Sequence, residues 1–512
     1  MTCRVVIIGA GPGGLAAAML LVHAGAEVSV LERLPKVGGR SGTIVADGFR
    51  FDLGPTFFLY PQILAEIFAT CGVCLEDEHE LMRLDPMYRL VFENGGEIEA
   101  FTDPTALARE VAKLCPDDAA ALPRFMADNR LKFEAFRPIL QAAFSDIRAV
   151  LTPHVLKALP VLRPFKSIDA DLAKYFKDPR VRLAFSFQSK YLGMSPFKCP
   201  SLFTILSFME YEHGVFHPRG GCGALMETMA RVARKMGVRI ETGEPVTGIL
   251  FEGRKATGVC TPTRKYAADA LVINADFAQT MSKLVPDRLR RRWRDGKIKK
   301  KKFSCSTFMM YLGLEGRFDH LAHHTVLLSE AYAQNLREIQ EGLVLPTQPS
   351  LYVQSACATD AKQAPPGTST LYVLVPVGHQ KGFINWNKEQ ARFRALILNR
   401  LEQLDLKNIE QRIVFEKILR PPDWEHDMQI YRGATFNLAH SMDQMLHNRP
   451  RNRFEDLERV YLVGGGTHPG NGLPVIFESA RITARLMAED LGLPNTAQKG
   501  PIYSKPNPMS AS

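Results

Sequence analysis

The sequence predicts an α/β fold in which a parallel-sheet domain is interrupted by two long insertions. Three observations carry this prediction. A β-branched run, a glycine-rich turn and an apolar helix follow one another at the N-terminus. Similar strand and helix patterns return at residues 214–276 and 456–494. The chain has 512 residues, 46% of them hydrophobic, which is enough for two to four domains of roughly 150 residues each.

The first unit reads as strand, turn, helix and strand. Residues 4–8 are mostly β-branched, as in a buried parallel strand. Residues 9–14 then read Gly-Ala-Gly-Pro-Gly-Gly, and residues 15–24, rich in Ala and Leu, predict a helix. A second strand at residues 27–31 ends next to Glu32. A hydropathy window would mark this uncharged start as a signal peptide or membrane span, but its glycines break the run.

This unit is suited to bind the ADP half of a dinucleotide. Gly9 allows a tight turn, Gly11 lets the backbone approach a pyrophosphate, and Gly14 lets the helix pack close to the strand. The helix N-terminus offers free N–H groups and the positive end of its dipole to the phosphates. Glu32 can accept hydrogen bonds from ribose hydroxyls and would repel a 2′-phosphate, which disfavours NADP.

The residues after Glu32 resemble a known extension of this site. Lys-Val-Gly-Gly-Arg-Ser-Gly-Thr at residues 36–43 resembles the glutathione-reductase-type FAD family that includes amine oxidases and carotenoid desaturases. The resemblance implies that Gly39 lies close to FAD and that Arg40 reaches its phosphates, with a solvated surface charge as the alternative for Arg40. The later segment at residues 51–56 resembles the one beside the flavin, and its candidate residues are Gly54, Pro55 and Thr56.

Two later segments look like the same nucleotide-binding fold returning. In the first, a helix over residues 224–235 is followed by strands, and the family resemblance places the backbone of Val246 against the adenine. In the second, a strand at residues 460–463 leads into a glycine turn and a helix from Val475 to about Glu489, a further anion-binding corner. Its candidate cofactor residues are Gly465, Gly466, Pro474 and Val475.

The predicted fold class is therefore α/β, with a Rossmann-like FAD-binding domain of glutathione-reductase type interrupted by a mixed helical and sheet substrate domain. The FAD-binding parts span residues 1–99, 214–276 and 456–494, and the substrate-domain parts span residues 100–213 and 277–455. The first insertion is mostly helical and apolar, notably over residues 136–165. The second mixes strands, such as residues 371–375, with a helix at 390–404. The Pro- and Ser-rich tail, residues 495–512, is expected to be disordered.

Nearly the whole chain except the tail resembles the bacterial and fungal type of carotenoid desaturase. Besides the FAD fingerprint, residues 175–196, 214–221 and 464–474 carry this resemblance and are more specific. The chain departs from the family at His217, where an aromatic residue is frequent, and at Asn471, where a small residue is common. These departures bear on the substrate and leave the cofactor unaffected.

The resemblance implies a desaturase that introduces conjugated double bonds into phytoene or 4,4'-diapophytoene (dehydrosqualene) by hydride transfer to flavin. Quinone or oxygen would be the electron acceptor, and an apolar tunnel would recognise the polyene. A carotenoid terminal-methyl oxygenase (diapolycopene oxygenase type) and a polyene isomerase stay open as alternatives. A non-catalytic prenyl-lipid carrier like the GDP-dissociation inhibitors is a further alternative. The intact glycine motif disfavours this carrier. An amine oxidase would need an aromatic cage that the sequence does not indicate.

His468 is the titratable residue that we predict near the flavin. It would orient or shuttle a proton, and the alternative is a turn histidine bonded to backbone. Asp276 and Glu478 are weaker candidates, because such carboxylates are often helix caps or packing residues. No metal site is expected: the nine cysteines are scattered, and the Cys71–Cys74 pair has no second pair to complete a zinc site.

We expect a cytoplasmic protein that is peripheral on the cytoplasmic face of the membrane, where an apolar polyene dissolves. From Arg288 to Lys302, ten of fifteen residues are basic, and Trp293 sits among them. Basic residues near anionic lipid gain about 1 kcal/mol each. The apolar residues 136–165 could enter the interface. A solvated helix face is the alternative for the basic run, and the net charge of +10 comes with no nucleic-acid-binding motif.

Overall fold

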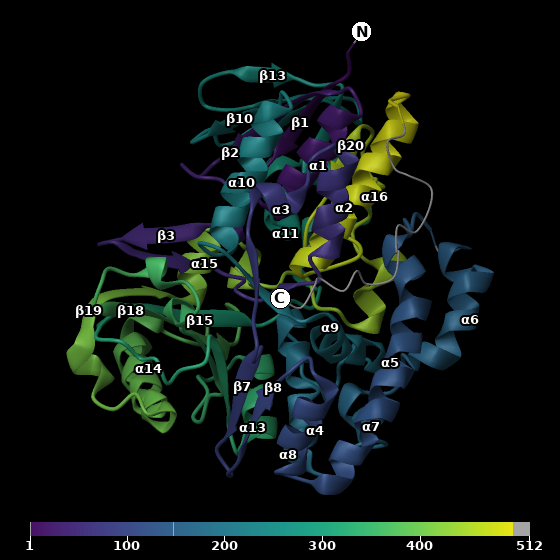
Figure 1. Cartoon of the computed structure of the whole chain (residues 1–512). Coiled ribbons are helices and arrows are strands. Elements are labelled where there is room, and N and C mark those ends of the chain that lie inside the picture. The colour runs from purple at the N-terminus through teal and green to yellow at the C-terminus, as the bar shows by residue number, and fades with distance from the viewer. Residues whose placement is uncertain (1, 147, 495–512) are drawn as a thin grey trace.

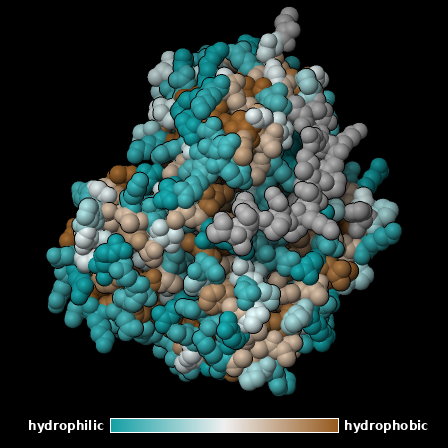
Figure 2. All heavy atoms as spheres, in the orientation of Figure 1, coloured by the Kyte–Doolittle hydropathy of each residue, from teal (hydrophilic) through white to brown (hydrophobic). Residues whose placement is uncertain are grey.

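The computed structural model describes residues 2–146 and 148–494. In Figure 1 the chain forms an upper part around a parallel sheet and a lower part. In the lower part a second sheet lies on the left and a group of helices on the right. On the face seen in Figure 2, hydrophobic residues form small groups among hydrophilic ones. The tail, residues 495–512, lies outside the described residues.

A five-stranded parallel sheet, in the order β10-β2-β1-β14-β20, forms the centre of the upper part. Its strands are β1 (Arg4–Ile8), β2 (Glu27–Glu32), β10 (Arg239–Thr242), β14 (Ala270–Ile273) and β20 (Val460–Leu462). The sheet thus combines strands from three distant parts of the chain, which confirms the predicted Rossmann-like fold.

Helices cover one face of this sheet and a small sheet covers the other. Val5 and Ile7 pack toward the helices, whereas Val6 and Ile8 pack toward the small sheet. The helices are α1 (Pro12–His23), α2 (Gln62–Thr70), α10 (Cys222–Lys235) and α16 (Leu473–Leu491). The opposite face carries β11 (Gly248–Glu252), β12 (Lys255–Cys260), β13 (Lys265–Ala267) and α11 (Phe277–Leu284). The first helix starts at Pro12, before the predicted residue 15, because proline suits the first helical position.

A seven-stranded mixed sheet, in the order β19-β15-β18-β17-β16-β7-β8, forms the lower left part. Its strands are β7 (Tyr88–Phe92), β8 (Glu97–Ala100), β15 (Ser306–Glu315), β16 (His324–Leu328), β17 (Leu351–Gln354), β18 (Thr368–Val377) and β19 (Ile413–Leu419). Helix α14 (Trp386–Leu401) packs on it through Trp386 and Phe393. Because β7 and β8 belong to this sheet, the domain boundary predicted at residue 99 lies inside β8.

The first insertion is mostly helical, as its pattern predicted. It contains α4 (Pro104–Ala112), α5 (Pro116–Gln141), α6 (Pro153–Leu162), α7 (Ile168–Leu172), α8 (Pro179–Ala184) and α9 (Ile205–His213). The remaining short elements are α3 (Leu75–Glu78), α12 (Asp295–Lys299), α13 (Tyr332–Glu341), α15 (Pro421–His426), β3 (Thr43–Ala46), β4 (Phe49–Asp52), β5 (Phe58–Leu59), β6 (Leu81–Arg83) and β9 (Val215–Pro218).

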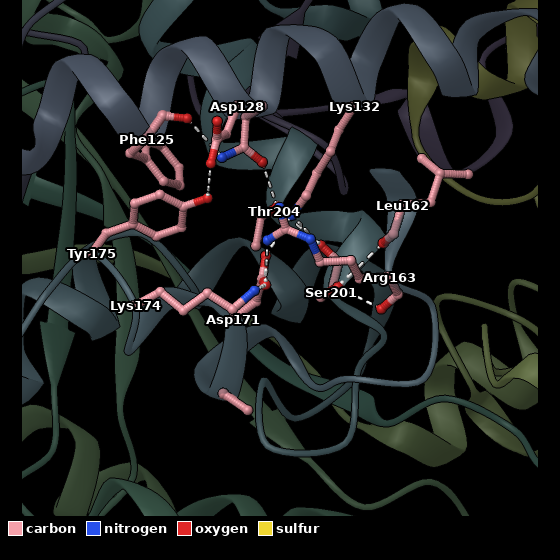
Figure 3. A network of polar contacts seen from close by, with 12 residues as sticks. Phe125, Asp128, Lys132, Leu162, Arg163, Asp171, Lys174, Tyr175, Ser201 and Thr204 are labelled. Carbon is pink, nitrogen blue, oxygen red and sulfur yellow. Dashed lines mark hydrogen bonds and ion pairs between the residues drawn. The ribbon is translucent and has the colours of Figure 1, made fainter. Parts of the chain in front are cut away.

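A buried polar network ties these helices together (Figure 3). Lys132 of α5 donates to Asp171 Oδ2 of α7 at 2.5 Å and to Thr204 Oγ1 at 3.0 Å. Arg163, directly after α6, and Lys174 also contact Asp171. Burial alone would raise the pKa of Asp171, but these cations lower it to about 2. The ion pairs fix the helical layer that forms one wall of the cavity described below.

The basic segment from Arg288 to Lys302 is only partly at the surface. Trp293 is 1% exposed, donates from Nε1 to Glu455 Oε1 at 2.8 Å and is covered by Arg292, so it does not face solvent. The exposed basic residues of the segment are Arg288, Arg291, Arg294, Lys297, Lys299, Lys300 and Lys302. Within residues 2–146 and 148–494, no helix combines the length and apolarity needed to cross a bilayer.

Candidate functional site

One cavity of about 580 Å³ runs from the carboxyl edge of the parallel sheet to the helical layer and the second sheet. The ends of four parallel strands open into it, which is the usual ligand edge of such sheets. The structure brings twelve of the predicted site residues together on its wall: Gly9, Gly11, Glu32, Gly39, Arg40, Gly54, Pro55, Thr56, Val246, Gly465, Pro474 and Val475.

Two helix N-termini point free N–H groups at this cavity. Gly11 caps α1 and Gly472 caps α16, and among the described residues no side chain caps either helix. Gly9 has a φ of +99°, which only glycine adopts readily. A Cβ on Gly14 would lie 2.2 Å from the Gly9 carbonyl oxygen, so Gly14 serves helix packing, as predicted, and does not line the cavity.

Glu32 is a buried acceptor at the end of β2. Its Oε2 accepts from the Ala10 N–H at 2.7 Å and its Oε1 from the Leu34 N–H at 2.8 Å. These bonds fix the orientation of the carboxylate and leave lone pairs on both oxygens for hydroxyl donors. Val246 lines the same cavity from the loop before β11.

Arg40 is held inside the molecule and is not a solvated surface charge. Its Nη1 donates to the Thr435 carbonyl at 2.7 Å. In the amide orientation that satisfies both neighbours, Asn437 accepts from Arg40 Nη1 and Nη2 at 2.9 and 3.0 Å and donates to Asp276 Oδ2 at 2.7 Å. Burial lowers the pKa of Arg40, and nearby Asp276 opposes this shift. The guanidinium is thus fixed on the cavity wall, and its contact with phosphates stays a prediction.

Three tyrosines of the second sheet fix the segment predicted to lie beside the flavin. Tyr311 donates to the Leu53 carbonyl at 2.5 Å, and Tyr372 donates to the Gly54 carbonyl at 2.6 Å. The Tyr352 hydroxyl lies 2.6 Å from Thr56 Oγ1. The three tyrosines come from β15, β18 and β17, so the second sheet positions residues 53–56.

Arg449 supports the glycine turn after β20. It is fully buried and donates to the carbonyls of Gly465 at 2.7 Å, Thr467 at 3.1 Å and Leu438 at 3.2 Å. Burial lowers its pKa to about 9. Within the described part of the chain no carboxylate pairs with it, so a positive charge lies beneath the turn and favours an anion there.

Two predicted site residues of this turn do not line the cavity. Gly466 packs against Phe277 and Asn437, with no room for a Cβ. His468 is 2% exposed, and its Nε2 lies 2.9 Å from the Ala142 carbonyl. Burial lowers its pKa to about 4. This placement matches the alternative of a turn histidine bonded to backbone and gives no support to a catalytic role.

The two weaker carboxylate candidates do line the cavity, but both have partners. Asp276 accepts from the Gln279 N–H at 3.0 Å and so caps α11. Glu478 lies 3.2 Å from Arg481 Nη1. Burial raises the pKa of both carboxyls.

Beyond residues 53–56 the cavity is mainly apolar. Side chains from α5, from the loop and helix around α9 and from the second sheet form its wall, among them Phe133, Phe136, Leu140, Leu206, Met309 and Val326. The Tyr352 hydroxyl, which lies on this wall, is also 2.8 Å from His324 Nδ1. This chamber suits an elongated hydrocarbon with a few polar groups near its inner end.

Sequence reasoning missed several groups at the cavity. Lys190 and Tyr191 line it, and Glu210 lies behind Tyr191 with no exposed surface. Glu210 accepts from Tyr88 at 2.9 Å and from Gln188 at 2.9 Å, while burial raises its pKa to about 7. Lys190 is the single charge in an apolar run from residue 183 to 197, a signal that could have identified it.

The donor and acceptor groups fit a bound FAD. The uncapped helix ends and the fixed arginine suit a diphosphate, Glu32 suits ribose hydroxyls, and residues 53–56 lead from this site into the apolar chamber. At Gly11 a Cβ would lie 3.2 Å from Asn274 Nδ2, so a side chain there would be crowded against Asn274.

Comparison with known proteins agrees with this geometry. A family model described as flavin containing amine oxidoreductase matches residues 12–491. The chain is 41% identical to the 4,4'-diapophytoene desaturase (4,4'-diapolycopene-forming) of a Methylomonas species, over 95% of this chain and 96% of that protein. It is 35% identical to the zeta-carotene-forming phytoene desaturase of Myxococcus xanthus, over 98% of both.

Solved structures show the same fold at low sequence identity. An oxidoreductase from Methanosarcina mazei matches with a TM-score of 0.60 and 20% identity, covering 93% of this chain and 98% of that one. A putrescine oxidase variant matches with a TM-score of 0.59 and 16% identity, covering 96% of this chain and 100% of that one.

Proposed function

This chain belongs to the flavin-containing amine oxidoreductase family, among the diapophytoene and phytoene desaturases, and from this we propose that it desaturates a linear isoprenoid. It is an FAD-dependent oxidoreductase. The observation that carries the proposal is the single cavity, because it connects a dinucleotide cradle to an apolar chamber lined by both insertions. Diapophytoene is the first substrate to test, since the 41% identical relative is named for it, and phytoene is the second.

We propose that FAD lies with its adenine at Val246, its ribose at Glu32 and its phosphates at Gly11, Gly39 and Arg40. The flavin would then lie between residues 54–56 and the turn at residues 465–475. The support is that Val246, Glu32, Gly11, Gly39, Arg40 and residues 54–56 line one cavity together with Gly465 and residues 469–475. When bound, FAD supplies the hydride acceptor for the reaction.

The protein's own residues would exclude water, align the chain and remove a proton. The apolar wall holds the polyene extended, and no strong base is required because the developing allylic cation is itself acidic. We propose that the Tyr352 hydroxyl takes the substrate proton while passing its own to His324 Nδ1, 2.8 Å away. Burial keeps the pKa of His324 well below its usual value, so the ring is neutral and its Nδ1 has a lone pair that can accept the proton. Quinone or oxygen would then take the electrons.

We also propose that the protein contacts the membrane with its helical insertion. Phe165 is 90% exposed, and Phe197 and Met442 gather with it around a small surface hollow that also contains Lys166 and Lys198. Exposed leucines near and on α6 extend this apolar surface: Leu151, Leu156 and Leu159. Such a mixture of apolar and basic groups suits the interface of an anionic bilayer. The exposed basic residues between Arg288 and Lys302 would add electrostatic attraction.

The function is tested by expressing the chain in bacterial cells that accumulate either diapophytoene or phytoene and analysing the extracted pigments by chromatography and absorption. We expect new conjugated double bonds, with the productive precursor fixing the chain length. Tyr352→Phe should lower the yield more than Tyr372→Phe at equal flavin content, since only Tyr352 contacts His324.

Two results would overturn the desaturase assignment. If the precursors stay unchanged and only a finished polyene is converted, the protein is a terminal-methyl oxygenase or an isomerase. If the purified protein is colourless and binds prenyl lipid without FAD, it is a carrier. If FAD binds and Tyr352→Phe leaves the pigment yield unchanged, only the proton-acceptor role of Tyr352 is wrong.

A further inference from the structure

Arg449 is a buried cation held beneath the turn that follows β20. Its side chain has no exposed surface. It donates hydrogen bonds to the carbonyl oxygens of Gly465 at 2.7 Å, Thr467 at 3.1 Å, Leu438 at 3.2 Å and Ala439 at 3.5 Å. These oxygens carry no net charge, so they fix the planar guanidinium in one orientation without neutralising it.

No acidic group compensates this charge within residues 2–146 and 148–494. Burial lowers the pKa of Arg449 to about 9 and no carboxylate opposes that shift, so the guanidinium is mainly charged at pH 7. The two carboxyls on the cavity wall have other partners: Asp276 caps α11, and Glu478 pairs with Arg481. A net positive charge therefore remains beneath the turn.

The charge of Arg449 acts on a residue of the cavity wall. His440 lines the cavity, is 2% exposed and accepts at Nε2 from the Asn471 N–H at 3.1 Å. Burial, and after it the charge of Arg449, lowers the pKa of His440 well below its usual value, so the ring is neutral at pH 7. The field of Arg449 thus reaches the wall next to Asn471, in the turn against which we propose that the flavin lies.

Arg449 itself does not line the cavity, whereas its partner Gly465 does. A hydrocarbon in the chamber therefore meets no polar surface of this arginine. An electrostatic interaction needs no contact, and it is stronger inside a protein than in water because the effective dielectric constant is lower. Arg449 is consequently compatible with an apolar substrate while it acts on a charge that forms at the turn.

Hydride transfer creates such a charge. A C–H bond of the substrate breaks, and its two electrons and its hydrogen move to the neutral flavin ring, so the ring gains one negative charge and the substrate one positive charge. Loss of a proton from the neighbouring carbon then forms the double bond. A cation that is fixed before the reaction stabilises the negative ring without any rearrangement of the protein.

We propose that Arg449 raises the reduction potential of the bound flavin, by favouring the negatively charged reduced ring over the neutral oxidised one. The inference rests on the proposed function, since it takes the flavin to lie against the turn at residues 465–475. Arg449 acts through this turn and touches neither cofactor nor substrate, so its role is electrostatic and it is not a catalytic residue.

The test measures the two-electron reduction potential of the FAD-loaded protein without oxygen, by equilibration with a dye of known potential. We expect Arg449→Met to lower the potential by at least about 30 mV, which equals a tenfold loss of affinity for reduced relative to oxidised FAD. Arg449→Lys keeps the charge and should lose less than about threefold of this relative affinity. Arg290→Met is the matched control and should leave the potential unchanged, because Arg290 is 1% exposed but bonds Asp295 at 2.9 Å outside the cavity.

Binding of ADP separates an effect on the flavin ring from an effect on the diphosphate, because ADP has the diphosphate and lacks the ring. The apoprotein of Arg449→Met should bind ADP within about twofold of wild type. Arg40→Met should weaken ADP binding, since we place the phosphates at Arg40. If Arg449→Met weakens ADP and FAD equally at an unchanged potential, the charge serves the diphosphate and the proposal is wrong.

The wild-type protein gives a readout that does not depend on the folding of a variant. Its bound FAD should have a higher potential than free FAD, since the protein binds the reduced form more tightly. A potential below that of free FAD would overturn the proposal. So would equal potentials of Arg449→Lys and Arg449→Met, because the charge would then have no effect.

Failure of this proposal can be told apart from failure of the proposed function. If the protein binds FAD and desaturates diapophytoene or phytoene while Arg449→Met keeps the wild-type potential, only the role of Arg449 is wrong. If the purified protein takes up no FAD, the placement of the flavin and the desaturase function fail together with it.

Discussion

Glu32 is a single residue on which cofactor binding should depend, because both its oxygens accept backbone N–H groups at the mouth of the cradle. Glu32→Gln keeps the shape but turns an amide N–H₂ toward one of these donors. We expect a loss of about 1 to 3 kcal/mol in FAD binding, because the amide N–H₂ cannot accept a hydrogen bond from the ribose hydroxyl as the carboxylate does. Titration calorimetry with the apoprotein measures it. Glu27→Gln at the exposed start of β2 is the control and should change nothing.

The carboxyl of Glu210 should make stability depend on pH. Its pKa is about 7 in the folded protein against an ordinary value of 4.5, so between these values the folded state keeps a proton that the unfolded state has lost. The free energy of unfolding therefore falls as pH rises through this window, by about 3 kcal/mol at most. Urea denaturation at pH 5 and pH 8 measures it. If Glu210→Gln shows the same pH dependence as wild type, the assignment is wrong.

At this scale the sequence predicted the cradle better than the chamber. The glycines and Glu32 could be recognised because a dinucleotide needs them at fixed spacing near one strand, and Arg40 was recognised through the family resemblance. Lys190, Tyr352 and Glu210 each have contacts with residues of other elements, and those contacts depend on packing that no local pattern encodes. His468 shows the converse: a histidine in a specific motif whose ring points away from the cavity toward the Ala142 carbonyl.

At the scale of elements, the contact between the second sheet and residues 53–56 can be tested by removing one hydrogen bond. Tyr372→Phe removes the hydroxyl that donates to the Gly54 carbonyl and leaves β18 intact. The lost hydrogen bond is worth about 0.5 to 1.5 kcal/mol, so FAD should bind about 2- to 10-fold more weakly. Flavin fluorescence during dialysis reports the loss. Tyr461→Phe is the control, because its hydroxyl bonds Asp490 instead; equal losses in both variants would contradict the role.

Elements were predicted most accurately where a local signal marks their ends. The strand predicted at residues 4–8 has these bounds in the structure, and the helix predicted from Val475 starts two residues earlier, at Leu473, with Pro474 in its first turn. The hairpin of β7 and β8 was assigned to the wrong side of a boundary, because its partner β16 lies more than 200 residues later in the chain. Strand pairing over such distances leaves no local trace.

For the whole molecule, the apolar patch around Phe165 is the place at which the proposed membrane contact can be tested. Replacing Phe165 and Phe197 by serine removes two exposed rings, each worth about 1.5 to 3 kcal/mol when buried in an apolar phase. We expect at least about tenfold weaker co-sedimentation with vesicles of phosphatidylglycerol and phosphatidylcholine. The control is Phe383→Ser, a ring in the second insertion whose exposure of 65% lies between those of Phe165 and Phe197.

Two further outcomes decide which part of the surface is responsible. If Phe383→Ser weakens sedimentation as much as the double variant, the patch has no special role. If the double variant Arg291→Ser, Arg294→Ser is the one that weakens co-sedimentation, and does so only with anionic vesicles, then the basic segment alone makes the contact.

The parallel sheet is completed by β20 and α16, which are the last strand and helix of the described chain, while its first strand starts at residue 4. Residues 4–459 are therefore synthesised before the strand and helix that complete the place for FAD. Nascent chains would wait with their apolar chamber unfinished, and a protein truncated before residue 460 could not take up cofactor at all. Uptake of FAD should therefore follow synthesis of α16.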